Sequence, residues 1–60
     1  MSTYKLYDAH SNQFLDWLDA EDDDMAVAEV ENIAYRLGAE VMLYNDNGRL
    51  ITTVLPDRGF

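Results

Sequence analysis

Residues 22–38, DDDMAVAEVENIAYRLG, contain the clearest periodic pattern in this chain of 60 residues. Apolar side chains recur there every three or four positions, the spacing of one face of an α-helix. The recurring set is Ala26, Val30, Ile33 and Leu37, widened by Val27 and Ala34. Aspartates precede the run, where helix caps are favoured, and Gly38 follows it with the residue type that suits a left-handed C-terminal turn. The pattern predicts a helix over residues 22–37.

The residues before this helix predict a β-hairpin over residues 3–20. TYKLYD (3–8) alternates like a strand, and AHSN (9–12) is a short polar connection. QFLDWLDA (13–20) fits either a strand or a short helix capped by Ser11. The strand alternative forms three favourable cross-strand pairs, each worth about 0.2–1 kcal/mol: Tyr4–Trp17, Leu6–Leu15 and Lys5–Asp16. These pairs favour the hairpin.

The residues after the helix, AEVMLYNDNGRLITTVLP (39–56), predict a second hairpin over residues 40–55. Asn47-Gly48, or Asp46-Asn47 closed by Gly48, supplies the positive φ angles of a tight turn, and Pro56 ends the returning strand because it cannot donate to a ladder. Residues 56–60 are expected to fray. The sequence therefore predicts an α+β fold, β-β-α-β-β, with one helix packed on one face of a four-stranded, mostly antiparallel sheet in a single domain, 1–60. Strand order is left open, and strands two and three would be parallel if they were neighbours.

The formal net charge is −8, from twelve acids against four bases, and no Lys or Arg lies between Lys5 and Arg36. This distribution excludes binding to phosphate backbones or anionic membranes, which requires clustered cations. The expected partner is a basic protein surface, such as that of a nucleic-acid-binding protein, with no direct contact to nucleic acid or membrane. The apolar fraction of 48% indicates a folded domain and not a disordered acidic tail.

The chain has no cysteine, no apolar run of about 18 residues and no apolar segment typical of a signal peptide near its start. These features predict a cytoplasmic protein without disulfides or thiolate metal sites. A 60-residue domain buries a small core, so a partner or a second copy would add useful stability.

Residues 16–31 hold eight carboxylates and no base. One interpretation is structural: the aspartates cap the helix, and the remaining acids form a solvated face. The other is a surface for a basic partner, here called the acidic surface, consisting of Asp19, Glu21, Asp22, Asp23, Asp24, Glu31 and Tyr35. Duplex DNA over the roughly 24 Å of such a helix carries about 14 charges, so one molecule imitates a duplex only in part.

A calcium loop is a third interpretation of the same acids, and it fits poorly. Asp19, Glu21 and Asp23 alternate as the start of such a loop requires. However, Asp24 occupies the position of the obligatory glycine and Val30 that of the final glutamate. No metal site and no cofactor are expected.

The second candidate surface is the side of the sheet turned away from the helix. Alternation places Lys5, Asp16, Thr53 and Leu55 there together with apolar and aromatic residues, whereas Leu15, Trp17 and Leu50 are expected to face the helix. The candidate contact residues are Tyr7, Phe14, Met42, Tyr44 and Ile51. Such a face is either covered by a different packing of the hairpins or used for a homodimer or another partner.

Nothing in the sequence indicates catalysis. His10 is the only histidine, it lies in a predicted turn, and no acid is fixed beside it by spacing. The NDNGR segment (45–49) is a turn and lacks the following helix of a phosphate loop. We therefore expect a small, acidic, non-catalytic binding protein, an inhibitor or nucleic-acid mimic acting on a nucleic-acid-processing protein, of the kind phages use against host defence. The alternative is a homodimerisation or assembly module that uses the apolar sheet face.

Overall fold

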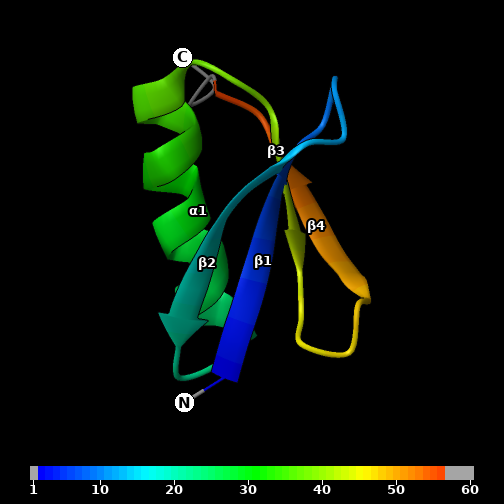
Figure 1. Ribbon diagram of the computed structural model, residues 1–60. Helices are drawn as coiled ribbons and strands as arrows, with labels where there is room; N and C mark the ends of the chain where they lie inside the picture. The colour runs from blue at the N-terminus through cyan, green and yellow to red at the C-terminus, as the bar shows by residue number, and fades with distance from the viewer. Residues whose placement is uncertain (1, 57–60) are drawn as a thin grey trace.

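The computed structural model describes residues 2–56 and shows one helix packed against a four-stranded antiparallel sheet (Figure 1). The elements follow the order β1 (Ser2–Asp8), β2 (Phe14–Ala20), α1 (Asp23–Leu37), β3 (Val41–Tyr44) and β4 (Leu50–Val54). The predicted α+β class and the β-β-α-β-β order are confirmed. Residues 13–20, which fitted a strand or a helix, supply strand β2. The predicted frayed tail lies outside the described residues, apart from Pro56.

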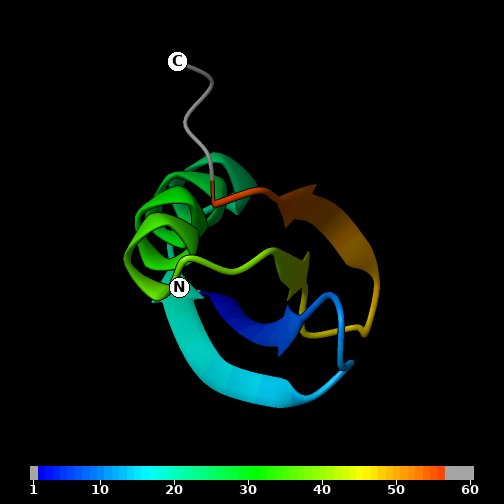
Figure 2. The same cartoon turned by 90° about the horizontal axis from the view of Figure 1, so that it is seen from above.

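The strand order in the sheet is β2-β1-β3-β4, and every neighbouring pair is antiparallel. Strands β2 and β3 are separated by β1, so they are not neighbours and do not pair. The sheet is curved, with one face against α1 and the other turned away from it (Figure 2). We call this second side the open face.

Helix α1 begins and ends where the sequence predicts, because its caps satisfy backbone groups that lack partners within the helix. The Asp22 side chain accepts the backbone N–H of Met25 at 2.9 Å. At the other end Gly38 has a φ of 65°, and its N–H donates to the carbonyl of Ala34 at 2.9 Å. Only glycine adopts this left-handed conformation without steric cost.

The core lies between α1 and the two central strands, β1 and β3. Its buried members are Tyr4, Leu6, Ala20, Ala26, Val30, Ala34, Val41 and Leu43. The helix contributes mainly alanines, which let its backbone approach the sheet closely. The predicted helical stripe is buried only as far as Ala34, because Leu37 in the last turn remains 56% exposed.

The register of the first hairpin differs by one residue from the predicted register. Tyr4 pairs with Leu18, Lys5 with Trp17, and Leu6 with Asp16. Because side chains alternate between faces, this shift reverses the predicted orientation of β2. Trp17 lies on the open face, and Asp16 lies on the helix side. A bulge between Leu6 and Tyr7 places Leu15 outside the regular ladder, so it does not face Leu6.

The second hairpin also contains an irregularity, between Leu43 and Tyr44. As a result Leu50 pairs with Tyr44 and is 46% exposed, whereas Ile51 packs against the core. The prediction that Leu50 faces the helix and Ile51 the open face is therefore wrong. The turn forms at the predicted place: Gly48 has a φ of 80° and donates its N–H to the carbonyl of Asn45. The prediction of a positive φ at Asn47 is wrong, because among the non-glycine residues that the structure describes only Asn12 has one.

Within residues 2–56, no helix is both long enough and apolar enough to cross a membrane.

Candidate binding surfaces

Four aromatic side chains form a continuous row across the open face. Tyr44 contacts Tyr7 with ring centroids 5.3 Å apart, Tyr7 contacts Phe14 at 5.6 Å, and Phe14 contacts Trp17 at 5.3 Å. All three contacts are edge-to-face, an arrangement favoured by the ring quadrupoles. We call these four residues the aromatic row. The ladder brings them together, because Tyr7 pairs with Phe14 and with Met42, next to Tyr44.

The aromatic row is open to solvent at its β2 end. Trp17 is 57% exposed and Phe14 is 45% exposed, which are high values for large apolar side chains. Tyr7, Met42 and Tyr44 are half-buried. Of the five predicted contact residues on this face, four lie together there, and Ile51 does not.

Sequence reasoning missed Trp17 on this face, because the predicted register turned it inward. One signal could have found it. Lys5 is the natural cross-strand partner of Trp17 as well as of Asp16, since an ammonium group is attracted to an indole face. The structure shows the Lys5 Nζ 5.3 Å from the centroid of the Trp17 ring.

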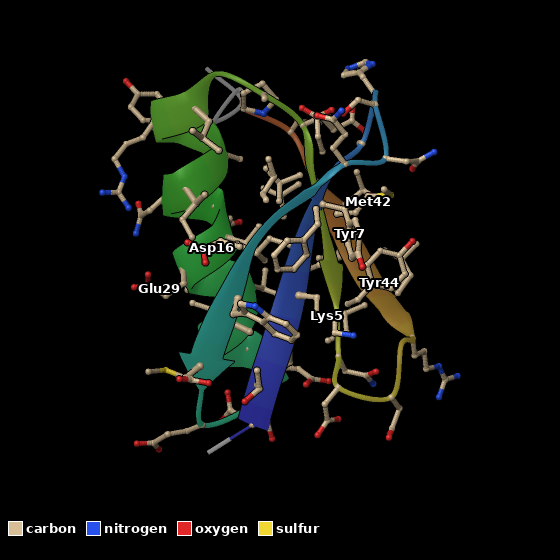
Figure 3. All side chains as sticks on the ribbon, in the orientation of Figure 1. Lys5, Tyr7, Asp16, Glu29, Met42 and Tyr44 are labelled. Carbon is tan, nitrogen blue, oxygen red and sulfur yellow. The ribbon has the colours of Figure 1, made fainter. Side chains whose placement is uncertain are left out.

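A groove of about 310 Å³ lies beside the aromatic row. It is lined by Lys5, Tyr7, Asn12, Met42, Tyr44 and Gly48. Four of these residues are labelled in Figure 3, where they gather on the side of the sheet away from α1. Asn12 comes from the β1–β2 turn and Gly48 from the β3–β4 turn, so residues of both turns help to form the hollow. Asn12 has a φ of 61°, a left-handed conformation that asparagine tolerates better than most residues.

The free edge of β2 is protected by a carboxylate. The backbone N–H of Asp8 donates to the Gln13 carbonyl, so the backbone N–H and C=O groups of Asp8 point toward β2. The direction of the backbone N–H and C=O groups alternates from residue to residue along a strand, so those of Lys5 point away from β2. The backbone N–H of Trp17, the partner of Lys5, therefore points to the outer edge of the sheet. At this edge, Asp16 Oδ1 accepts a hydrogen bond from the backbone N–H of Trp17 at 2.7 Å. This contact occupies a donor that an added strand would need.

Several acids of the predicted acidic surface have structural partners. Asp19 accepts a hydrogen bond from the Thr3 hydroxyl at 3.0 Å, and Asp23 accepts one from the Tyr4 hydroxyl at 2.8 Å. Asp22 is the N-cap of α1. Capping and tertiary hydrogen bonds therefore account for the positions of three of the six acids.

The other acids of this surface, Glu21, Asp24 and Glu31, are exposed. Within residues 2–56, none of the three has a hydrogen bond or an ion pair to another side chain. Tyr35, the aromatic member of the acidic surface, is 58% exposed. The helix thus carries an exposed acidic side, but nothing in its geometry directs these carboxylates to a common point.

Two ionisable groups have shifted pKa values with clear causes. Burial, together with its hydrogen bond to Asp23, raises the pKa of Tyr4 above 10.0. Hydrogen bonds from the backbone N–H groups of Ser11 and His10 lower the pKa of Asp8 below 3.8. Both groups stabilise the fold, the first at the start of α1 and the second in the β1–β2 turn.

Among the described residues that line the groove, none is an Asp, Glu or His. His10 lies on the exposed β1–β2 turn with its Nε2 3.6 Å from Glu40 Oε1. In the part of the chain that the structure describes, no three His, Asp or Glu side chains are grouped as metal ligands.

No family model, curated protein or solved structure significantly matches this chain.

Proposed function

We propose that this chain is a small, acidic, non-catalytic binding protein whose open face contacts a basic protein, such as a nucleic-acid-binding protein that it inhibits. The observation that carries this proposal is the exposed aromatic row. Interface hot spots are rich in Trp and Tyr, and large exposed apolar patches on small proteins commonly mark contact sites. Trp17, at 57% exposure, is the strongest candidate for such a hot spot.

The charge supplies the selectivity for a basic partner. A net charge of −8 attracts basic surfaces from a distance and speeds their association at low salt. Exposed aromatic rings also stack with arginine and lysine side chains. Asp24 and Glu31 belong to α1, on the opposite side of the sheet from the open face (Figure 2), and Glu21 lies just before this helix. They would contribute to the association rate more than to the lifetime of the complex.

Nucleic-acid mimicry is a weaker form of the same proposal. Helix α1 has 15 residues and is therefore roughly 22 Å long, a length over which duplex DNA carries about 13 charges. The acidic surface has six acids, three exposed without side-chain partners and three held by structural contacts. Six charges are fewer than the number that duplex DNA carries over this length. The proposed partner therefore recognises the aromatic anchors of the open face, and the acids of α1, on the opposite side of the sheet, act on it through long-range attraction (Figure 2).

The test compares two sets of variants in binding to proteins retained from a cell extract by the tagged chain. Trp17→Ala should weaken binding of the retained partner by about 30-fold or more, as expected for a hot-spot residue. Leu37→Ala is the matched control, because Leu37 is equally exposed, at 56%, but lies at the end of α1. Equal affinity of the Trp17→Ala and wild-type proteins would refute docking on the open face.

The acidic set consists of Glu21→Gln, Asp24→Asn and Glu31→Gln in one protein, which leaves the structural acids intact. This variant should reduce the association rate, and the difference from wild type should disappear at high salt. If it instead abolishes binding while Trp17→Ala has no effect, the acidic surface is the docking site.

Homodimerisation through the open face is the second candidate. Its supporting observation is the placement of charge: among the described residues that the ladders put on this face, Asp19 is the single acid, and it lies at one end. Two copies can therefore meet there without opposing rows of carboxylates. Trp17→Glu should then convert a dimer to monomers in sedimentation experiments, and an unaltered dimer would exclude this interface.

A further inference from the structure

Lys5 has an unusual position for the base of such an acidic chain. It is half-buried on the open face, and within residues 2–56 no carboxylate forms an ion pair with it. Its Nζ instead lies over the Trp17 ring, at the border of the groove. The chain has twelve acids against four bases, so the lack of an acidic partner for this lysine among the described residues is notable. The groove therefore contains an ammonium group without an acidic partner.

The remaining walls of the groove combine apolar surface with a few polar groups. The rings of Tyr7 and Tyr44 and the Met42 thioether provide the apolar surface. Asn12 adds polar surface from the β1–β2 turn. Ligand pockets typically have this composition, with mainly apolar walls and one charged group that fixes the orientation of the ligand.

The volume limits the size of the occupant. At about 310 Å³ the groove is at the lower end of the range for small-molecule sites, so it fits a molecule with a single ring. A small cation inside the groove would lie beside Lys5 and be repelled, whereas the basic groups of a docking protein can meet the exposed Phe14 ring, which is not part of the groove lining. An anionic occupant would pair with Lys5, and a carboxylate is a strong acceptor for an ammonium donor.

The negative charge of the whole chain opposes any anion, and Asp46 in the β3–β4 turn and Asp19 at one end of the open face are acids on the groove side of the sheet. The helix acids contribute less to this opposition. The exposed acids Asp24 and Glu31 belong to α1, which covers the opposite face of the sheet. Charges separated by more than about 8 Å are largely screened at physiological salt, whereas Lys5 would contact the ligand directly.

We propose that this groove binds a small aromatic carboxylate, with the carboxylate paired to Lys5 and the ring packed among Tyr7, Met42 and Tyr44. This inference does not rest on the proposed protein partner, since it concerns the isolated chain and a small molecule. Because Tyr7 and Tyr44 also belong to the aromatic row, a bound ligand would occupy part of the docking face.

The experiment is a titration of the ¹⁵N-labelled protein with phenylacetate and, separately, with phenylacetamide. The two probes share the ring and differ in charge. At about 10 mM, a concentration that saturates a millimolar site, phenylacetate should shift the amide signals of the groove residues. It should also change the fluorescence of Trp17, the only tryptophan, because Lys5 moves from the ring to the ligand. Phenylacetamide should bind with a dissociation constant at least about tenfold higher than that of phenylacetate.

Lys5→Met tests the role of the ammonium group, because methionine keeps an unbranched apolar stem and removes the charge. This variant should lose the preference for phenylacetate over phenylacetamide. Arg49→Met is the matched control, since it removes one positive charge outside the groove lining, and it should keep the preference. If Lys5→Met does not fold, the two-probe titration of the wild-type protein decides the question alone.

Two results would overturn the proposal. Equal binding of both probes would show a purely apolar hollow in which Lys5 has no role. Absence of any shift with phenylacetate at about 10 mM, or shifts outside the groove only, would show that the groove does not bind this class of ligand.

Discussion

A single carboxylate oxygen, Oδ1 of Asp22, determines where α1 begins. It accepts the Met25 N–H, while the Asp22 carbonyl accepts the N–H of Ala26 and starts the helical ladder. The neighbouring acids have different roles: Asp23 binds the Tyr4 hydroxyl, and Asp24 is exposed. Three consecutive aspartates thus divide into a cap, a tertiary contact and a solvated charge.

Replacing Asp22 should measurably destabilise the fold. Asp22→Ala removes the cap and should lower the free energy of unfolding by about 1 kcal/mol. Glu21→Ala is the control, because Glu21 is exposed and precedes the cap, and it should change stability by less than about 0.5 kcal/mol. Urea unfolding followed by circular dichroism measures both. Equal effects of the two substitutions would contradict the capping role.

Tyr4 gives the fold a dependence on alkaline pH. Its pKa is raised above 10.0 in the native state, chiefly by burial and then by the hydrogen bond to Asp23. The unfolded chain therefore loses the phenolic proton first, so the stabilising contribution is complete below pH 10 and is lost as pH rises through the native pKa.

Tyr4→Phe should remove this part of the alkaline destabilisation. Above pH 10 the urea midpoint of the wild-type protein should fall more steeply than that of the variant. Parallel curves for wild type and Tyr4→Phe would show that Tyr4 does not titrate differently on folding.

At the scale of elements, the type and order of the helix and strands were predictable, but the register of the first hairpin was not. The helix has a strong 3.6-residue period, and both hairpins have clear turn residues. In β2, however, both adjacent registers bring apolar residues to the helix side: Leu15 and Trp17 in one, Leu18 and Ala20 in the other. Cross-strand pairs alone could not decide between them.

The bulges explain why most of the open face was predictable, and why the positions of Asp16, Trp17, Leu50 and Ile51 were not. Residues of β1 and β3 follow strict alternation, so Tyr7, Met42 and Tyr44 lie where predicted. In β2 and β4 an extra residue interrupts the alternation, which exchanges Trp17 with Asp16 and Leu50 with Ile51. The groove was also unpredictable, because it requires Asn12 and Gly48 from turns far apart in the sequence.

Asp16 provides a prediction about the β2 edge. Asp16→Ala leaves the outward N–H of Trp17 without its carboxylate partner and removes a charge from an edge strand. The variant should self-associate at lower concentration than the wild type, as measured by light scattering. Asp19→Ala removes the same charge from the same strand, but the Asp19 side chain binds the Thr3 hydroxyl and not the edge backbone. Equal association of both variants would attribute the effect to charge alone.

At the scale of the whole molecule, the same charge that selects a basic partner opposes folding. The excess of twelve acids over four bases in 60 residues gives a net repulsion among the carboxylates that is strongest in the compact state. The core that offsets this repulsion is small, and its helix side consists largely of alanines. Stability should therefore depend on ionic strength more than in a protein of balanced charge.

Sodium chloride should stabilise the wild-type protein, because the screening length falls from about 30 Å at 0.01 M to about 10 Å at 0.1 M. The free energy of unfolding should rise by roughly 1 kcal/mol over this range. The control carries Glu21→Gln, Asp24→Asn, Glu29→Gln and Glu31→Gln, which change the net charge from −8 to −4 and spare Asp19, Asp22 and Asp23. It should be more stable than wild type at low salt and respond less to added salt. If the wild type and the control respond equally to salt, the exposed helix acids do not weaken the fold, because water already screens their repulsion.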